Sequence, residues 1–380
     1  MNDTLTFVYV INVDWYFKLH WLKRALAVLY SGAKVHLVLG VTDTKLMDEF
    51  TNYGFICHPW QLNRNSINIF ANINELVGLF RLLKSITPSL VHAITIKPNI
   101  YVGLIAYWIK APYVLSVTGT GTVFSNQHWT IKCIRPLVRL LFKWLKTGQN
   151  IRKIIFENKD DQHYFVTTRL CHASEAVTIL GAGVDTALYY PSPEMVSDTP
   201  VILFAARLLW DKGLGDLVQA GRNLRTLGVK FIIQVAGIID ASSNRAIAIR
   251  VLEDWHKEGV IEWLGMQTNM PELINRSHII VLPSFYGEGV PRILIEAAAC
   301  GRPIITTNMP GCREIVRQGI NGFLISPHDV DALGQALLAL INNPELRLSM
   351  GAQGRELVVS QFSEAQVIKE TLVLYQELLP

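Results

Sequence analysis

Acidic residues are missing from one long stretch of this 380-residue chain. None occurs between Glu75 and Glu157, whereas eleven lysines and arginines lie there. Residues 1–190 hold 19 basic and 11 acidic residues, and the remaining chain holds 16 and 20. Since the net charge is only +4, the positive excess belongs to the first half. This asymmetry predicts an anionic partner for that half: phosphates, nucleic acid or a lipid surface.

Cysteines are also few, and no apolar run is long. The five cysteines are scattered and form no Cys-x-x-Cys pair, which indicates buried thiols in a reducing cytoplasm. The richest apolar stretch, residues 100–117, is interrupted by Lys110 and Pro112, so its unbroken part is too short to span a bilayer. The first residues include Asp3 and no basic cluster, so they are expected to form a strand rather than a signal peptide.

What the chain does contain is a regular alternation of β-rich and amphipathic helical segments. In the first half the expected strands are residues 6–12, 34–39, 54–58, 90–94, 113–117, 153–157 and 177–180. In the second half they are residues 201–206, 230–237, 261–265, 278–284 and 303–307. Helical patterns lie between them, for example at 16–30 and 75–84. Apolar strands joined by helices predict an α/β protein whose parallel sheets are covered on both faces.

The length of the chain predicts two domains. The Pro- and Ser-rich residues 189–200 mark the linker. We therefore expect an N-terminal domain at 1–188 and a C-terminal domain at 189–362, with a last helix at 363–380 packing back on the first domain. Two doubly wound domains that face each other leave a cleft at the strand ends, where ligands bind in such sheets.

Two glutamates eight positions apart lie in residues 285–307, "FYGEGVPRILIEAAACGRPIITT". Glu288 stands in a glycine-rich turn that follows an expected strand, and Glu296 stands on the helix after it. The amides of Gly289 and Val290, with Pro291 in the first turn of that helix, can hold an anion such as a diphosphate. One carboxylate for a sugar and one for a ribose would suit a nucleotide-sugar. Alternatively, Glu288 is a solvated turn residue and Glu296 a helix-surface acid.

Two basic residues follow the strand at 201–206. In "ARLLWDKGLGDLV", residues 206–218, Arg207 and Lys212 lie between a strand end and the start of a helix. A guanidinium with a nearby ammonium suits a diphosphate whose charge grows as it departs. The alternative is two ordinary surface bases.

These motifs together resemble the C-terminal half of bacterial family 4 glycosyltransferases, which are retaining enzymes of the GT-B fold. The resemblance is carried by "ARLLWDKG", "VAG", "LG", the long segment around Glu288 and Glu296, and "NGFL", and it covers residues 178–380. It implies that Glu288 binds donor-sugar hydroxyls, Glu296 the ribose, and Arg207 with Lys212 the diphosphate. It also implies donor contacts from five further positions: Gly237, Met266, Gly289, Val290 and Pro291.

The N-terminal half is similar, more distantly, to the subset of this family that acts in capsule, O-antigen and lipid-linked oligosaccharide assembly. It lacks the glycine-rich loop after the first strand, where "NVDWYF" stands. Thr118, in "TGTG", replaces a family histidine, and the amides of Gly119 and Gly121 could serve instead. Lys97 is a candidate for an acceptor phosphate or a surface lysine. His20 is a candidate cleft residue or a packing histidine.

Two further patterns bear on metals and membranes. Asp329 and Asp331 imitate a metal-binding Asp-x-Asp, but they stand where acids cap the expected helix at 330–342, so no metal cofactor is expected. Residues 129–153 carry a basic stripe beside an apolar one, which indicates a helix lying on an anionic membrane; the alternative is a packing helix with a solvated basic face. The stripe and its flanking tryptophans are Trp129, Lys132, Arg135, Arg139, Lys143, Trp144 and Lys146.

The sequence therefore predicts a metal-independent, retaining transferase that moves a hexose or N-acetylhexosamine from a nucleoside diphosphate, UDP being expected, to a membrane-borne glycan. It would act at the inner face of the cytoplasmic membrane, without nucleic acid. Two alternatives remain: another GT-B enzyme, such as a nucleotide-sugar epimerase or an inverting transferase, or a non-catalytic nucleotide-sugar or polyanion-binding protein.

Overall fold

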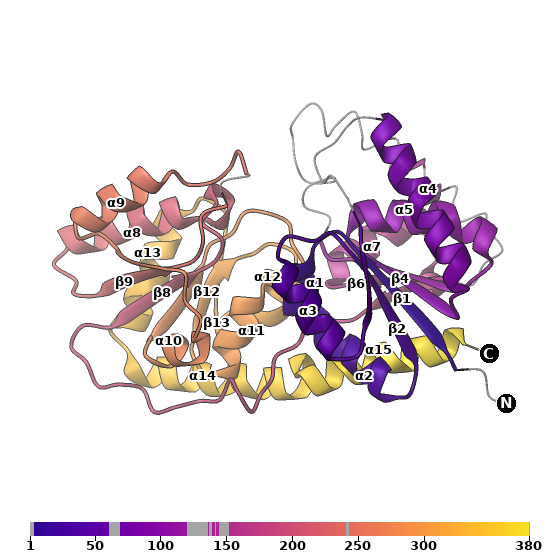
Figure 1. Ribbon diagram of the computed structural model, residues 1–380. Coiled ribbons are helices and arrows are strands. Elements are labelled where there is room, and N and C mark those ends of the chain that lie inside the picture. The colour runs from indigo at the N-terminus through magenta and orange to yellow at the C-terminus, as the bar shows by residue number, and fades with distance from the viewer. Residues whose placement is uncertain are drawn as a thin grey trace. The chain divides into compact units, whose positions relative to one another are not determined.

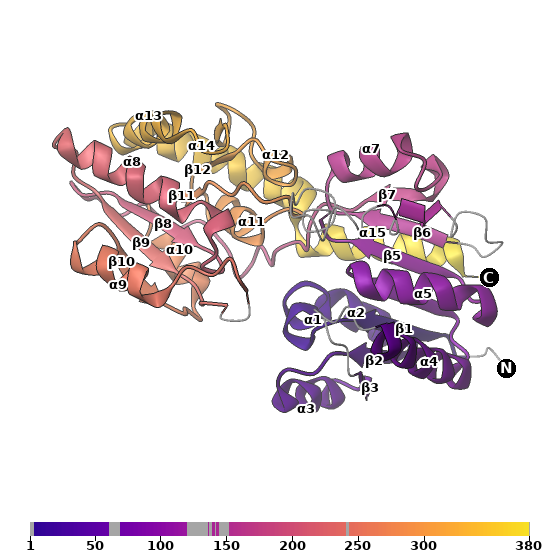
Figure 2. The same ribbon diagram turned by 90° about the horizontal axis from the view of Figure 1, so that it is seen from above.

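A computed structural model describes residues 4–60, 69–119, 136, 139–140, 142–143, 152–240 and 243–379. The chain divides into two compact units (Figures 1 and 2). The N-terminal unit comprises Met1–Ala182 and Ala365–Pro380, and the C-terminal unit comprises Gly183–Glu364. The divisions at Ala182 and Glu364 lie six and two residues from the boundaries that the sequence predicts. Each unit is built around its own parallel sheet.

The sheet of the N-terminal unit has seven strands in the order β3-β2-β1-β4-β5-β6-β7, all pairs parallel. Its strands are β1 Thr6–Ile11, β2 Lys34–Leu39, β3 Ile56–Pro59, β4 Leu90–Ile94, β5 Tyr113–Val117, β6 Arg152–Phe156 and β7 Ala176–Thr178. Its helices are α1 Asp14–His20, α2 Leu22–Tyr30, α3 Thr44–Asn52, α4 Ile69–Ile86, α5 Ile96–Ile109, α7 Lys159–Thr167 and α15 Glu364–Leu378, with a short 3-10 turn at Ala173–Glu175.

Strand β1 shows why this sheet is covered on both faces. Successive side chains of a strand point to opposite faces. Phe7 and Tyr9 pack with α1, α2, α3 and α15, whereas Val8 and Val10 pack with α4, α5 and α7. An unbroken apolar strand therefore supplies two hydrophobic cores, as the sequence predicts for a buried parallel sheet.

The C-terminal helix α15 belongs to the N-terminal unit. Its apolar residues Val367, Leu374 and Leu378 lie in the core that covers one face of the seven-stranded sheet. Tyr375 adds a buried polar contact, because its hydroxyl lies 3.1 Å from the Tyr9 hydroxyl. The chain reaches α15 through a π-helical turn at Val358–Phe362, after α14 (Pro344–Leu357).

The sheet of the C-terminal unit has six parallel strands in the order β10-β9-β8-β11-β12-β13. They are β8 Val201–Ala205, β9 Ile232–Ala236, β10 Glu262–Gly265, β11 Ile279–Leu282, β12 Ile304–Thr307 and β13 Gly322–Ile325. Helices α8 Leu214–Thr226, α9 Ile249–Lys257 and α13 Val330–Ile341 cover one face. Helices α10 Met270–Asn275, α11 Arg292–Ala299 and α14 lie on the other, and α12 is the short Cys312–Ile315 (Figure 1).

Three details differ from the sequence-based expectation. The helix expected at 16–30 is two helices, α1 and α2, which meet at Trp21 (φ −126°). The helix expected at 75–84 extends from Ile69 to Ile86. Strand β13 was not expected as a strand. It begins with Gly322, where a Cβ would lie 2.1 Å from the carbonyl oxygen of Ile304, so only glycine allows this close pairing with β12.

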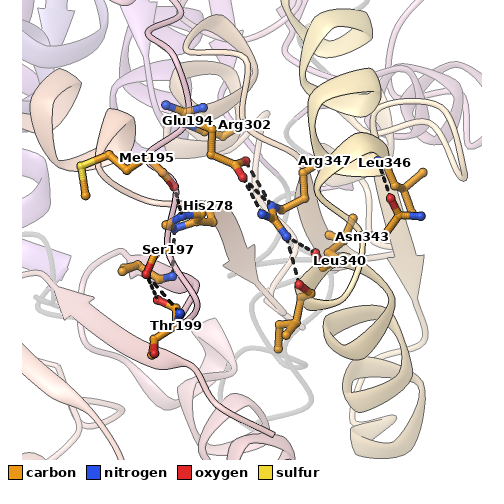
Figure 3. A network of polar contacts seen from close by, with 12 residues as sticks. Glu194, Met195, Ser197, Thr199, His278, Arg302, Leu340, Asn343, Leu346 and Arg347 are labelled. Atoms are coloured by element: carbon orange, nitrogen blue, oxygen red, sulfur yellow. Dashed lines mark hydrogen bonds and ion pairs between the residues drawn. The ribbon is translucent and has the colours of Figure 1, made fainter.

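The segment expected as a linker, residues 189–200, is fastened to the C-terminal unit (Figure 3). Glu194 accepts a hydrogen bond from Nε of the buried Arg347 at 3.0 Å. The ring Nε2 of His278 lies 2.9 Å from the carbonyl oxygen of Met195. Because an ion pair with the buried Arg347 and a backbone contact both hold it, this segment is an ordered part of the unit rather than a free tether.

The predicted membrane helix at 129–153 lies mostly outside the described residues, which include only Arg139 and Lys143 of its basic stripe. Arg139 donates to the Tyr164 hydroxyl, with Nε at 3.1 Å. Phe142, from the apolar stripe, is buried in the core against Phe165, with ring centroids 5.2 Å apart. The Phe142 ring therefore faces the protein, as in the packing alternative, whereas the neighbouring Leu140 is 64% exposed. Across the described part of the chain, none of the helices has the length and apolar content needed to cross a bilayer.

Four cysteines lie in the described residues, and all are free thiols. Cys171, Cys300 and Cys312 are buried, as the scattered spacing predicts, and Cys57 is half-buried.

Candidate functional site

The loops that follow β8 and β11 lie against each other at the carboxyl edge of the C-terminal sheet. Gly213 has φ +80°, and a Cβ there would lie 2.1 Å from the carbonyl oxygen of Pro283. The amide of Phe285 donates to the carbonyl oxygen of Asp211 at 3.0 Å. The hydroxyl of Ser284 donates to the same oxygen at 3.2 Å. Backbone packing and the Ser284 hydroxyl thus hold the two sequence motifs together.

Lys212 and Glu288 meet at this junction. The Lys212 Nζ lies 2.6 Å from each carboxylate oxygen of Glu288. The Ser284 hydroxyl oxygen also lies 3.1 Å from Glu288 Oε1, so its one proton is shared between this carboxylate and the Asp211 carbonyl oxygen. Lys212 is only 8% exposed, so its charge is largely withdrawn from water. A desolvated ion pair has stronger electrostatic interactions than a surface pair, and a bound anion can compete for the same ammonium.

Arg207 is more exposed and is held by a different acid. It lies two residues after the end of β8, and its Nη1 lies 3.2 Å from Asp240 Oδ2. Asp211, just before Lys212, forms an ion pair with Arg245, whose guanidinium carbon lies 4.7 Å from the centre of the Tyr286 ring. The sequence predicted a role for neither Asp240 nor Asp211. Each lies more than 30 positions from its partner along the chain, so no regular spacing in the sequence indicates the pair.

Glu296 lies on α11 and is 6% exposed. Nε of Arg292 donates to Glu296 Oε1 at 2.7 Å, and the Tyr189 hydroxyl also hydrogen-bonds the carboxylate. Burial raises the pKa of Glu296, and the Arg292 charge opposes that rise. An ionised carboxylate has about four acceptor sites, so these two donors leave room for further hydroxyls. Arg292 was missed, although its i, i+4 spacing from Glu296 is a sequence signal for such a pair.

The predicted donor-binding backbone is tightly packed. At Gly237 (φ +152°), after β9, a Cβ would lie 1.9 Å from the carbonyl oxygen of Ala206. At Gly311 (φ +83°) a Cβ would lie 1.9 Å from the carbonyl oxygen of Gly289. Glycines are thus required where the loops bearing Arg207 and Glu288 contact their neighbours.

Three other predicted donor-side residues are Pro291, Val290 and Met266. Pro291 is the N-cap of α11 (ψ 123°), so the helix begins at Arg292, one residue later than expected. Val290 is buried at 6% exposure, which leaves its backbone rather than its side chain for a ligand. Met266, just after β10, is largely exposed.

The candidate acceptor residues lie in the N-terminal unit. Lys97, at the start of α5, forms an ion pair with Glu75 at 2.9 Å. His20 ends α1 and stacks on Tyr16, with ring centroids 4.2 Å apart. Thr118 and Gly119 follow β5, and Gly119 has φ +125°. Gly121 lies outside the described residues.

The Asp-x-Asp at 329–331 serves as a helix cap. Asp329 accepts a hydrogen bond from the Ala332 amide at 2.9 Å at the start of α13. In the described part of the chain no three His, Cys, Asp or Glu side chains gather into a group that could hold a metal ion.

Comparisons with known proteins indicate the family of this chain. A family model described as glycosyl transferases group 1 matches residues 190–357, and a model described as glycosyl transferase 4-like matches residues 7–158. The chain is 23% identical over 349 residues, 87% of its length and 89% of the relative's, to the N,N'-diacetylbacillosaminyl-diphospho-undecaprenol alpha-1,3-N-acetylgalactosaminyltransferase of Campylobacter jejuni. It is 24% identical over 357 residues, 91% of its length and 90% of the relative's, to the capsular polysaccharide biosynthesis glycosyltransferase CapM of Staphylococcus aureus.

Among solved structures, the crystal structure of Anabaena HepE in complex with UDP is similar in fold. Its TM-score is 0.77 at 16% identity, and the alignment covers 98% of this chain and 100% of that one. The two family models match one segment in each unit and together span most of the chain. This protein therefore belongs to the family 4-like glycosyltransferases with the GT-B fold.

Proposed function

We propose that this glycosyltransferase transfers a hexosyl or N-acetylhexosaminyl group from a UDP-sugar with retention of the anomeric configuration. The observation that carries the proposal is the contact between Lys212 and Glu288 at 2.6 Å. In a nucleotide-sugar the anomeric carbon is bonded directly to the β-phosphate. A carboxylate for the sugar hydroxyls and an ammonium for that phosphate must therefore be immediate neighbours, and these two are.

Glu296 is the proposed ribose ligand. Its carboxylate is held in one orientation by Arg292 at 2.7 Å and by Tyr189, and it has acceptor sites left for two adjacent hydroxyls. A preorganised carboxylate loses little freedom on binding, which favours affinity. The choice of UDP is supported by the likeness in fold to a protein solved with UDP.

The proposed transfer needs no enzymic nucleophile. The acceptor oxygen forms a bond to the anomeric carbon on the face from which the diphosphate leaves, while the bond from that carbon to the phosphate oxygen breaks. The acceptor proton passes to a β-phosphate oxygen, so UDP is the leaving group and the base. Lys212 stabilises the negative charge that develops on the phosphate, and Arg207 is the proposed second cation. Since side chains supply this positive charge, we propose that no metal is required, and a chelator should leave the rate unchanged.

The proposed acceptor is a polyprenyl-diphosphate-linked or related surface glycan, reached at the inner face of the cytoplasmic membrane. The Campylobacter relative is named for a diphospho-undecaprenol substrate, and the staphylococcal relative for capsule synthesis. The positive excess in residues 1–190 suits an anionic acceptor and membrane surface.

The test begins with a thermal-shift panel of UDP-, GDP- and TDP-sugars, because a ligand that binds only the native state raises apparent stability. Donors that bind are then incubated with a short-chain polyprenyl-diphosphate-linked sugar, and the product is analysed by NMR. An α-linked product from an α-linked UDP-sugar supports the proposal. An inverted linkage contradicts retention. An epimerised UDP-sugar, or binding with no transfer to any such acceptor, contradicts the proposed reaction.

A further inference from the structure

One face of α4 is exposed, basic and free of acidic residues. Ile73, Val77, Arg81 and Lys84 recur every three or four positions and are all exposed, so they form one stripe along the helix. The acid of this helix, Glu75, is half-buried and pairs with Lys97. The exposed stripe therefore carries positive charge and apolar surface.

The end of α5 extends this stripe with two aromatic side chains. Tyr107 and Trp108 are each 60% exposed. Trp108 lies against Phe80 of α4, with ring centroids 6.3 Å apart, and the Lys84 ammonium lies 6.0 Å from the centre of the same Phe80 ring. Figures 1 and 2 both show α4 and α5 side by side. We call Ile73, Val77, Arg81, Lys84, Tyr107 and Trp108 the α4–α5 surface.

The composition of this surface indicates its partner. Large exposed aromatic side chains are costly in water, yet tryptophan and tyrosine favour the boundary between lipid headgroups and acyl chains. Lysine and arginine near an anionic bilayer each contribute an attraction that salt screens. Aromatic, aliphatic and basic side chains together, with no acid among them, complement an anionic lipid surface.

The geometry points to the α4–α5 surface as the site where this protein docks on an anionic lipid bilayer. The inference deepens the proposed function and rests on it, since a lipid-linked acceptor lies in a membrane. It does not depend on residues 129–153, where the described positions Arg139 and Phe142 contact the protein itself.

The test uses flotation of the full chain with vesicles of phosphatidylcholine alone and of phosphatidylcholine with phosphatidylglycerol. Wild type should float only with the anionic vesicles, and added salt should weaken the binding. Replacing Lys84→Glu and Trp108→Ser should reduce the vesicle partition coefficient at least about tenfold, because one lost base alone accounts for about fivefold.

A matched control lies on the opposite face of the same sheet. Lys23 and Tyr30 of α2 are also an exposed base and an exposed aromatic, Tyr30 being 74% exposed. The double variant Lys23→Glu/Tyr30→Ser carries the same chemical changes and should float as wild type does. Equal loss in both variants would mean a general charge effect and would overturn the inference.

Transfer assays separate this inference from the proposed function. With a short-chain acceptor in solution, Lys84→Glu/Trp108→Ser should transfer sugar at the wild-type rate. With a vesicle-embedded acceptor, its transfer rate should fall by the same factor as its vesicle partition coefficient. If no protein transfers sugar, the proposed function fails, and flotation still decides the surface. Wild type that ignores anionic vesicles, or a surface whose mutation changes the oligomeric state instead of flotation, would overturn the docking site.

Discussion

Gly213 and Pro283 approach so closely that a Cβ on the glycine would lie 2.1 Å from the proline carbonyl oxygen. This contact joins the loop that ends in Lys212 to the strand end that precedes Glu288. Backbone packing thus sets the position of the ion pair between Lys212 and Glu288. This packing requires glycine at position 213, where φ is +80°.

The first prediction concerns this packing. Gly213→Ala should lower the free energy of unfolding by more than the ~1–2 kcal/mol that a left-handed alanine costs, because the loop must also move. The shift should weaken binding of a UDP-sugar as well. Urea unfolding and calorimetry measure the two effects.

Gly228 provides the control. It has φ +78° but open space around a Cβ, so Gly228→Ala should cost only the ~1–2 kcal/mol of strain and leave donor binding intact. Equal effects of the two substitutions would show that the loop contact is unimportant.

The second prediction concerns the ion pair. Lys212→Ala should keep the fold and measurable UDP binding but slow transfer by about 10²–10³-fold, or ~2.7–4 kcal/mol, because a cation that stabilises the departing phosphate is lost. Glu288→Gln should slow transfer to a similar extent, because the charged ligand of the sugar hydroxyls is lost. Steady-state rates with saturating donor check this. Turnover near the wild-type value in either variant would remove these residues from the reaction.

The sequence was sufficient for most of the fold, because hydrophobic periodicity is a local property. The strand patterns at 6–12 and 201–206 correspond to β1 and β8, and each contains an unbroken apolar run, at residues 7–11 and 201–206. The four-residue strand β13 was not predicted, because its pairing with β12 depends on a distant backbone contact at Gly322. A short strand that begins with glycine has too few apolar residues to be recognised from its own hydrophobic pattern.

The candidate site could be predicted only as separate pieces. Lys212 and Glu288 each stand in a recognisable motif, but 76 positions separate them, and no spacing rule predicts their contact. The same holds for Arg207 with Asp240, 33 positions away. Tertiary packing decides such pairs, whereas the partner of Glu296 four residues earlier was within reach of a helical argument.

The third prediction concerns ribose recognition. Glu296→Ala should weaken binding of plain UDP by about 1.5–3 kcal/mol, the contribution of a hydrogen bond to a charged group. Glu296→Gln, which keeps the shape, separates loss of charge from loss of packing around Arg292. Isothermal calorimetry with UDP is the measurement.

Glu272 serves as the comparison, since it pairs with Arg276 at the same i, i+4 spacing but on an exposed surface. Glu272→Ala should leave UDP affinity unchanged. If Glu296→Ala also leaves it unchanged while the fold is intact, Glu296 is a structural helix residue.

The fourth prediction concerns pH and the contact that holds α15. His92 is buried, with Nδ1 2.5 Å from the Tyr375 hydroxyl and Nε2 2.7 Å from the Ser116 hydroxyl. Burial, together with the nearby Arg24 charge, lowers the pKa of His92 well below its ordinary value of 6.5. In the unfolded chain the residue regains that ordinary value.

The sign follows from proton uptake. As the pH falls through about 6.5, the unfolded chain binds a proton at His92 and the folded chain does not, so the free energy of unfolding decreases. Between about pH 7.5 and about pH 5.5 this residue should lower the free energy of unfolding by ~1.4 kcal/mol.

His92→Gln should be less stable than wild type at neutral pH. Its free energy of unfolding should then fall by ~1.4 kcal/mol less than that of wild type when the pH is lowered to about 5.5. Urea unfolding at both pH values, with the exposed His163→Gln as control, measures the difference. A His92→Gln variant with the same pH dependence as wild type would contradict a buried neutral imidazole at this position.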